Sequence, residues 1–221
     1  MGFADSMVEG TPRFRRSHTG IIGDYTVNMI TQTPVVADQA FYRSLRTLFA
    51  RSRAHKIVET GTYQGLGTTL AICEALAANE FSADQFYSIE VNPNYYAQAW
   101  GNLSNRPVHP RLLRGLSIPR NLLPSEQPET NFPDALDDLL GYVLRTFDRA
   151  PDFVLLDSAG PLGLIELKYA LSIIKAPCHI GLNNVQGTHG PSLQFMQSDA
   201  RFKLVEINRD KAGYCIAHFT P

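Results

Sequence analysis

Residues 56–72, "KIVETGTYQGLGTTLAI", place three glycines and four threonines between an apolar run and a helical pattern. Gly61 and Gly65 can adopt positive φ angles and, without side chains, they let a ligand contact the main chain. A helix that begins directly afterwards presents unpaired backbone N–H groups, which suit an anionic group. In open α/β sheets, ligands lie beyond the carboxyl ends of the strands and contact the first strand-to-helix turn. The segment therefore predicts a ligand cradle.

The glycine spacing argues against the two common phosphate-binding loops. Dinucleotide-binding folds carry G-x-G-x-x-G, whereas the glycines here are Gly61, Gly65 and Gly67. The phosphate loop G-x-x-x-x-G-K-[ST] fails as well, because Leu66 stands where its second glycine is required. A NAD-dependent Rossmann oxidoreductase is therefore an alternative whose expected motif is missing.

Glu90 ends the next strand candidate, in the stretch "FYSIEVNP". A carboxylate at that position can accept hydrogen bonds from both hydroxyls of a ribose, as in other nucleoside-binding sheets. A simple polar strand end is the alternative when Glu90 is taken alone. Because this strand follows the glycine-rich turn, the ribose-binding interpretation is favoured.

These residues are positioned by strands and helices that alternate along the chain. An amphipathic helix is expected first, because apolar residues from position 37 to position 49 form one stripe. The strand candidates are residues 56–59, 85–89, 111–113, 153–156, 179–182, 203–207 and 214–219. Helical patterns cover residues 66–78, 94–103, part of 132–147, and 162–174. This alternation predicts a parallel α/β sheet with helices on both faces.

Three further segments complete the predicted organisation. Only the short polar stretch 208–213 joins the last two strand candidates, so they form a hairpin and the final strand runs antiparallel. Residues 119–133, rich in Pro, Glu and Asn, are expected to be a surface insertion. Residues 1–33 have weak periodicity and are expected to form a partly ordered N-terminal arm, which leaves residues 34–221 as one domain.

The composition narrows the class of protein. The chain is 44% hydrophobic and 19% charged, with a net charge of −1, so no global field attracts nucleic acid or an anionic membrane. Small-molecule partners are expected, and a homodimer is left open. Cys73, Cys178 and Cys215 are widely spaced in apolar surroundings and predict core residues rather than disulfides or zinc ligands. With neither a signal-peptide pattern nor a long apolar run, we expect a cytoplasmic protein.

The ordered set of motifs resembles the class I S-adenosylmethionine-dependent methyltransferases. The corresponding stretches are "VETGTYQG", "SIEVNP", "LLRGLS", "FVLLDSAG", "HIGLNNVQG" and the terminal hairpin "FKLVEI…GYCIAHF". The resemblance extends from residue 34 to the C-terminus and implies a Rossmann-like seven-stranded methyltransferase sheet. It also implies a transferase of the EC 2.1.1 type that uses S-adenosylmethionine.

The resemblance further implies a cofactor site. The residues it assigns are Glu59, Gly61, Thr62, Tyr63, Gly65, Thr68, Glu90, Ser117 and Asp157. The loop residues are expected around the amino-acid end of the cofactor, Glu90 at its ribose, and Ser117 beside its adenine. For Thr68, a helix-start residue with a locally bonded hydroxyl is the alternative.

Within the class, the nearest resemblance is to the cation-dependent O-methyltransferases of catechols and caffeoyl esters, which implies methylation of a small molecule at oxygen. In the places of that family's metal ligands stand Asp157, Asn183 and Asn184. Asn183 replaces an Asp, which removes a negative charge that Mg²⁺ prefers, so we expect metal affinity to fall. Gly160 stands where these enzymes carry a lysine that assists proton removal, so the usual base is absent.

Two residues are candidates for catalysis. Asp157 is open to three interpretations: a metal ligand, a carboxylate that orients the substrate, or a polar strand end near the sulfonium, of which the second is favoured. His189 is the candidate replacement for the missing base, because imidazole titrates near neutral pH. A solvated loop histidine is the alternative for His189. The altered metal and base positions also leave open a cofactor-binding protein without catalysis.

Overall fold

The computed structural model describes residues 39–124, 132–159 and 161–221. The predicted arm at 1–33, the middle of the predicted insertion and Gly160 lie outside these residues. The helices are α1 (Gln39–Ser52), α2 (Thr68–Ala78), α3 (Pro93–Leu103), the short η1 (Arg120–Leu122), α4 (Leu139–Thr146), α5 (Leu162–Ile173) and α6 (Gly190–Ser198). The strands are β1 (Ile57–Thr60), β2 (Phe86–Glu90), β3 (Arg111–Arg114), β4 (Phe153–Leu156), β5 (Cys178–Asn183), β6 (Phe202–Asn208) and β7 (Tyr214–Phe219).

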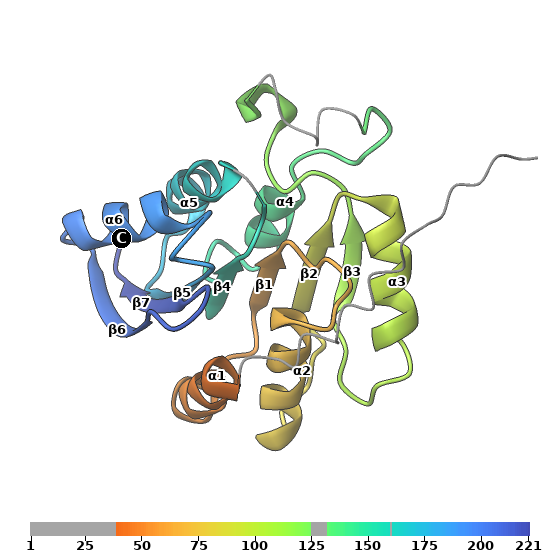
Figure 1. Ribbon diagram of the computed structural model, residues 1–221, viewed down its shortest axis with the longest axis horizontal. Helices are drawn as coiled ribbons and strands as arrows, with labels where there is room; N and C mark the ends of the chain where they lie inside the picture. The colour runs from red at the N-terminus through yellow and green to blue at the C-terminus, as the bar shows by residue number, and fades with distance from the viewer. Residues whose placement is uncertain (1–38, 125–131, 160) are drawn as a thin grey trace, which may run out of the picture. The chain divides into compact units, whose positions relative to one another are not determined.

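The seven strands form one sheet in the order β3-β2-β1-β4-β5-β7-β6 (Figure 1). All neighbours from β3 to β5 pair in parallel. β7 lies between β5 and β6 and runs antiparallel to both, which confirms the predicted hairpin. After β1 the chain forms β2 and β3 on one side of β1, and it then crosses to the other side of β1 to form β4 and the later strands. The strand order therefore reverses between β1 and β4, where ligands bind in sheets of this kind.

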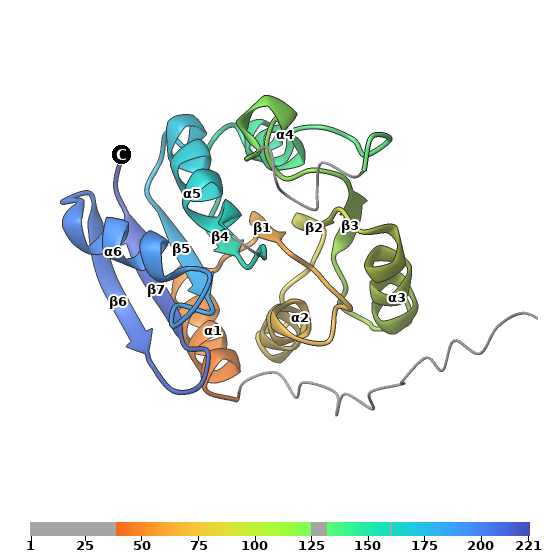
Figure 2. The ribbon, with the colours of Figure 1, turned by 45° about the horizontal axis from the view of Figure 1, so that its top comes forward.

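Helices cover both faces of the sheet, as Figures 1 and 2 show. The central strand β4 explains why, because its successive side chains point to opposite faces. Phe153 and Leu155 belong to the core that α1 and α2 cover, whereas Val154 and Leu156 belong to the core that α4 and α5 cover. A strand buried on both faces reads as a continuous apolar run, which is how "FVLL" appears in the sequence.

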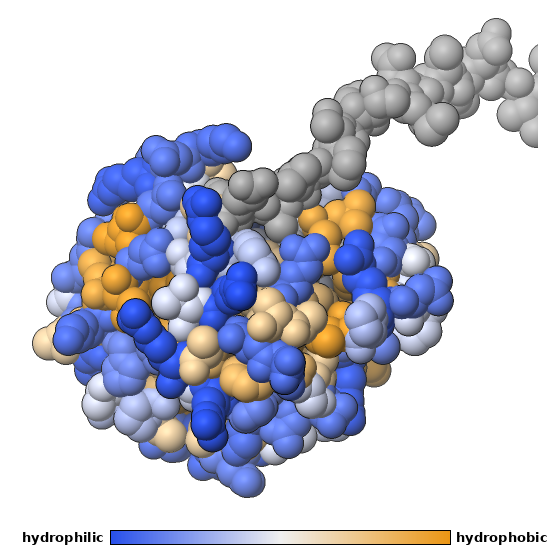
Figure 3. Space-filling model, turned by 90° about the horizontal axis from the view of Figure 1, so that it is seen from below, coloured by the Kyte–Doolittle hydropathy of each residue, from blue (hydrophilic) through white to orange (hydrophobic). Residues whose placement is uncertain are grey.

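Helix α1 has the predicted apolar stripe. Phe41, Leu45 and Phe49 are buried against α2 and the sheet. The arginines of α1 and of the residues after it are exposed: Arg43, Arg46, Arg51 and Arg53. The face of the molecule in Figure 3 mixes hydrophilic residues with separate hydrophobic areas. The exposed arginines thus lie on the solvent-facing side of the amphipathic helix α1.

Other features of the described residues agree with the sequence, with one exception. The three cysteines are buried and free. Of the helices described, none is long and apolar enough to cross a membrane. The exception is α6, which the sequence did not predict because its Gly-Pro start and nine residues give a weak pattern. Leu193 and Met196 of α6 are buried in the core beside α5.

Candidate functional site

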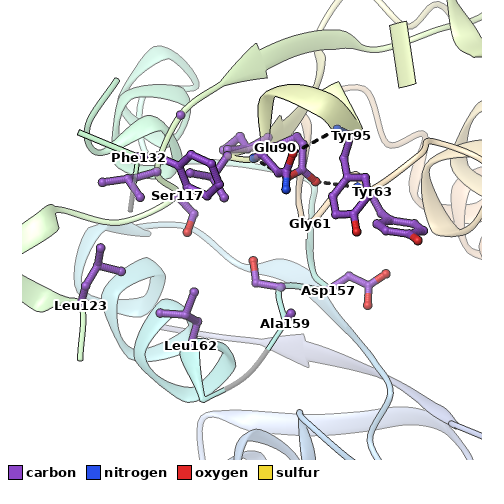
Figure 4. Close-up of a pocket in the computed structure, with 16 residues that line it drawn as sticks. Gly61, Tyr63, Glu90, Tyr95, Ser117, Leu123, Phe132, Asp157, Ala159 and Leu162 are labelled. Carbon is purple, nitrogen blue, oxygen red and sulfur yellow. Dashed lines mark hydrogen bonds between the residues drawn. The ribbon is translucent and has the colours of Figure 1, made fainter. Parts of the chain in front are cut away.

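A cavity of about 290 Å³ lies at the carboxyl ends of β1, β2 and β4 and beside the turn after β3. Its volume is close to the lower end of the range for small-molecule sites. One end is apolar and is lined by Leu123, Phe132 and Leu162. The other end is lined by Gly61, Tyr63, Tyr95 and Asp157, with Glu90 between the two ends (Figure 4). The cavity therefore has the polarity of a ligand with an apolar ring at one end and charged groups at the other.

Gly61 and Gly65 of the glycine-rich loop are glycines for different physical reasons. Gly61 has φ +82°, and a Cβ on it would fall against the carbonyl group of Asp157. This glycine therefore lets the ends of β1 and β4 approach each other at the cavity. Gly65 has φ +75°, and its Cβ would lie 2.6 Å from Cδ1 of Leu103. Gly65 thus allows α3 to pack against the loop, and it is not among the residues that line the cavity.

Glu90 fixes the loop and also lines the cavity. One carboxylate oxygen accepts a hydrogen bond from the backbone N–H of Tyr63 and the other from that of Asn92, each at 2.7 Å. Tyr63 has a left-handed φ of 52°, which turns its N–H toward Glu90 and its ring against that of Tyr95 at 4.3 Å. A carboxylate oxygen can accept more than one hydrogen bond. Glu90 can therefore hold the loop and bind ligand hydroxyls together.

Glu59 points away from the cavity, into the layer between β1 and α2. Its side chain is fully buried and accepts hydrogen bonds at 2.6 Å from the hydroxyls of Thr68, Thr69 and Ser88. Burial raises the pKa of Glu59, although these hydroxyls oppose the shift. Thr62 is also buried, and its hydroxyl bonds to that of Ser88. These residues support the loop from behind.

Asp157 follows β4 and borders the polar end of the cavity. Its Oδ1 accepts a hydrogen bond from the Asn183 amide at 2.9 Å, and its Oδ2 lies 2.9 Å from the Thr68 hydroxyl. Burial raises the pKa of Asp157 to about 7; the bond from Asn183 opposes this, and the charge of Glu59 adds to it. The carboxylates of Glu59 and Asp157 share Thr68, whose single hydroxyl proton can serve only one of them at a time.

The predicted metal ligands do not fit a resident divalent cation. Asn183 turns an N–H donor toward Asp157, where a metal site would place an oxygen ligand. Asn184 adopts a left-handed φ of 54°, and its carbonyl accepts the backbone N–H groups of Gly187 and His189. Across 39–124, 132–159 and 161–221, no group of three His, Cys, Asp or Glu side chains could hold a metal.

His189 is buried behind the cavity rather than solvated in a loop. Its side chain is 0% exposed, and its Nε2 lies 3.2 Å from the carbonyl oxygen of Ser158. The ring packs against Gly163 of α5, where any Cβ would collide with it. Nδ1 has no hydrogen-bond partner among the residues that the structure describes, and burial lowers the pKa of His189 to about 4. His189 does not line the cavity, and it contacts the backbone of a residue that does.

Glu166 of α5 is a buried carboxylate that the sequence reasoning missed. It is 0% exposed and accepts hydrogen bonds from the hydroxyls of Thr60, Ser117 and Ser158. Ser117 and Ser158 line the cavity, so Glu166 lies directly behind its wall. The available signal was an acidic residue in the apolar stretch "LGLIEL", at the start of the helix that follows β4.

The structure thus divides the predicted residues into two groups. Those that line the cavity are Gly61, Tyr63, Glu90, Ser117 and Asp157. Those that lie behind it or beside it are Glu59, Thr62, Gly65, Thr68, Asn183, Asn184 and His189. The sequence did not single out the lining residues Asn92, Tyr95, Phe132 and Leu162, which come from the start of α3, the turn before α4 and the start of α5.

Several solved structures with the same fold are methyltransferases. The SAH-bound methyltransferase PaMTH1 of Podospora anserina matches with a TM-score of 0.54 at 14% identity, over 81% of this chain and 78% of that one. The O-methyltransferase of Bacillus cereus in complex with SAH matches with a TM-score of 0.53 at 14% identity, over 86% and 84%. TomG of Streptomyces achromogenes, an O-methyltransferase of tomaymycin synthesis in complex with SAM, matches with a TM-score of 0.53 at 15% identity, over 85% and 82%.

These likenesses establish the fold alone, because the sequence identities are too low to establish a shared function. No protein-family model matches the sequence, and no curated protein matches it either. The chain therefore has the Rossmann-like methyltransferase fold, with a mostly parallel sheet and an antiparallel C-terminal hairpin strand.

Proposed function

We propose that this protein is an S-adenosylmethionine-dependent methyltransferase that methylates a small molecule at oxygen, with residues 34–221 as its catalytic domain. The observation that carries the proposal is the position of Glu90. This carboxylate ends β2, next to the switch point between β1 and β4, and lies between the apolar and the polar end of one cavity. Three solved proteins with this fold are in complex with SAH or SAM, which supports the choice of cofactor.

The chemistry of the cavity fits the three parts of an adenosyl ligand. Leu116, Phe132 and Leu162 offer apolar surface to the adenine ring. Glu90 accepts hydrogen bonds from the ribose hydroxyls. The amino-acid part is then directed toward Gly61, where the main chain is accessible and Asp157 is close. A carboxylate near a sulfonium is also electrostatically favourable.

Methyl transfer requires mainly that the protein align the methyl donor with the acceptor. When bound, S-adenosylmethionine supplies an activated methyl group, and its transfer is an in-line displacement that needs orientation and exclusion of water. An oxygen acceptor must also lose its proton. We assign Asp157 to orient the acceptor hydroxyl and to receive that proton, because it is the carboxylate at the polar end of the cavity. His189 is not assigned as the base, because it is buried away from the cavity.

Calorimetric titration with S-adenosylmethionine tests the cofactor assignment. Glu90→Gln should weaken binding about tenfold to a hundredfold, because hydrogen bonds to a charged acceptor contribute about 1.5–3 kcal/mol. Glu74→Gln, on the exposed side of α2, is the matched control and should bind like the wild type. The assignment is wrong if the wild type shows no binding, or if it binds NAD more tightly than S-adenosylmethionine.

Turnover tests the catalytic part separately. With methyl-labelled cofactor and a panel of small hydroxylated compounds, the wild type should label at least one acceptor. Asp157→Asn should then lower kcat by about 10²–10⁴-fold, the usual contribution of a general base, and change cofactor affinity far less. Equal turnover by Asp157→Asn would exclude this carboxylate as the proton acceptor. Cofactor binding without any labelled product would instead favour the alternative of a binding protein without catalysis.

A further inference from the structure

Glu166 joins the ends of three strands beneath the wall of the cavity. Its Oε2 accepts the hydroxyl of Thr60 at the end of β1, at 3.0 Å. Its Oε1 accepts two hydroxyls, that of Ser158 after β4 at 2.8 Å and that of Ser117 after β3 at a shorter distance. The carboxylate is fully buried and bonded at both oxygens, so its orientation is fixed. Ser117 and Ser158 lie side by side, because both reach the same oxygen.

The number of protons available fixes the direction of the hydrogen bonds that the hydroxyl groups of Ser117 and Ser158 can make. A hydroxyl has one proton to donate and two lone pairs to accept with. Ser117 and Ser158 both donate their proton to Glu166, and both line the cavity. The side of each hydroxyl oxygen that faces the cavity therefore carries lone pairs. The pair can accept hydrogen bonds from a ligand and cannot donate to it.

The hydroxyl groups around Glu166 match the hydrogen-bonding capacity of a carboxylate. A carboxylate only accepts hydrogen bonds, so three hydroxyl donors satisfy it. A neutral carboxyl would have to donate one hydrogen, and one hydroxyl would then have to turn round.

We propose that Glu166 is a positioning residue that makes Ser117 and Ser158 hydrogen-bond acceptors, so that the site selects a ring with an amino group over one with a carbonyl oxygen. This inference rests on the proposed function, because it places the adenine of the cofactor at this wall. The exocyclic amine of adenine has two N–H donors, and the wall offers two adjacent acceptors. Hypoxanthine carries an oxygen at the same position, and its lone pairs would face those of the serines.

The test compares S-adenosylhomocysteine with S-inosylhomocysteine, which has an oxygen in place of the exocyclic amine and a proton on the neighbouring ring nitrogen N1. Calorimetric titration of the wild type should give a dissociation constant at least about tenfold lower for the adenosyl compound, because a buried unsatisfied polar group is costly. In Glu166→Gln the amide N–H₂ donates to the serines and turns their protons toward the cavity. The ratio of the two dissociation constants should therefore fall toward one. Glu74→Gln should keep the wild-type ratio.

Each outcome separates this inference from the proposed function. If neither compound binds the wild type, the proposed function fails, and this inference fails with it. If both bind the wild type equally, the cofactor site stands and the polarity inference is overturned. An unchanged ratio in Glu166→Gln would show that Glu166 is not its source. If circular dichroism shows that Glu166→Gln does not fold, Ser117→Ala takes its place and should reduce the preference for the adenosyl compound, whereas an unchanged ratio overturns the inference.

Discussion

At the scale of residues, four carboxylates lie at the carboxyl edge of the sheet, and their partners give them different roles. Glu90 and Asp157 line the cavity, whereas Glu59 and Glu166 are fully buried and bonded to hydroxyls behind it. Glu59 faces α2, and the next residue, Thr60, faces Glu166 on α5, because successive strand residues point to opposite faces. Two of the four thus support the loops that carry the other two.

The Asp157–Asn183 hydrogen bond leads to a prediction about metal dependence. In the wild type, Mg²⁺ or EDTA should leave the melting temperature and cofactor affinity unchanged, because the amide already satisfies the carboxylate. Asn183→Asp replaces the donor with a second carboxylate, which should cost about 1–2 kcal/mol, or about 2–8 °C for a chain of this size. Mg²⁺ should restore the loss, because two adjacent carboxylates attract a hard cation.

Thermal melts of the wild type and of Asn183→Asp, with and without Mg²⁺, test this prediction. Asn121→Asp on the exposed surface is the control. A wild-type protein that loses activity in EDTA and recovers it with Mg²⁺ would contradict this prediction. It would also show that Asn183 serves as a ligand.

His189 predicts a loss of stability in acid. Burial lowers its pKa from the ordinary value of 6.5 to about 4, so the folded state binds fewer protons than the unfolded state between these values. The contribution of His189 to the free energy of unfolding is therefore complete above pH 6.5. It is lost as the pH falls toward 4, by about 3 kcal/mol in all. His189→Gln, which keeps an N–H for the Ser158 carbonyl, should remove this component.

Urea unfolding of the wild type and of His189→Gln over this pH range checks the prediction. His109→Gln, at an exposed position, should keep the wild-type pH dependence. Parallel curves for the wild type and His189→Gln would show that the buried imidazole does not titrate in this way.

At the scale of elements, the loop after β1 depends on two glycines that tolerate substitution differently. Both have positive φ, so an alanine at either should cost about 1–3 kcal/mol in backbone strain. A Cβ at Gly61 also meets the backbone of Asp157, whereas a Cβ at Gly65 meets the movable side chain of Leu103. Gly61→Ala should therefore lose more stability in urea unfolding than Gly65→Ala. Gly101→Ala, on open α3 surface, should be neutral or stabilising, and equal losses at 61 and 65 would contradict this account.

The elements also show which features a sequence can predict. The strands β1 to β5 and the helix α1 can be recognised in the sequence, because the apolar runs of the strands and the apolar stripe of the helix are distinct patterns. Helix α6 does not, since Leu193 and Met196 alone anchor it and its stability comes from packing against the core. Glu90 was predicted from its place at a strand end. Glu166 was missed, because nothing local shows that its partners come from three different strands.

At the scale of the whole molecule, the parallel sheet and the final antiparallel hairpin followed from alternation and one short connection, and the structure confirms both. The side chains around the cavity could not be predicted in the same way. They come from the ends of four strands, from the starts of α3 and α5 and from the turns before α4, and their contacts depend on how those elements approach each other. The sequence thus predicts where a ligand binds in this fold better than it predicts which atoms face that ligand.

Ligand binding should stabilise this domain as one unit. The two cores lie on opposite faces of one sheet and share its strands, as the alternating residues of β4 show, so unfolding should occur in one transition. S-adenosylhomocysteine at about 100 times its dissociation constant should add about 2.7 kcal/mol, which corresponds to a rise of about 5–11 °C in melting temperature. Calorimetric scans with and without the ligand measure this rise, and Glu90→Gln at the same ligand concentration should show a smaller one. A second transition that the ligand leaves unmoved would mean that part of the sheet unfolds independently of the cavity.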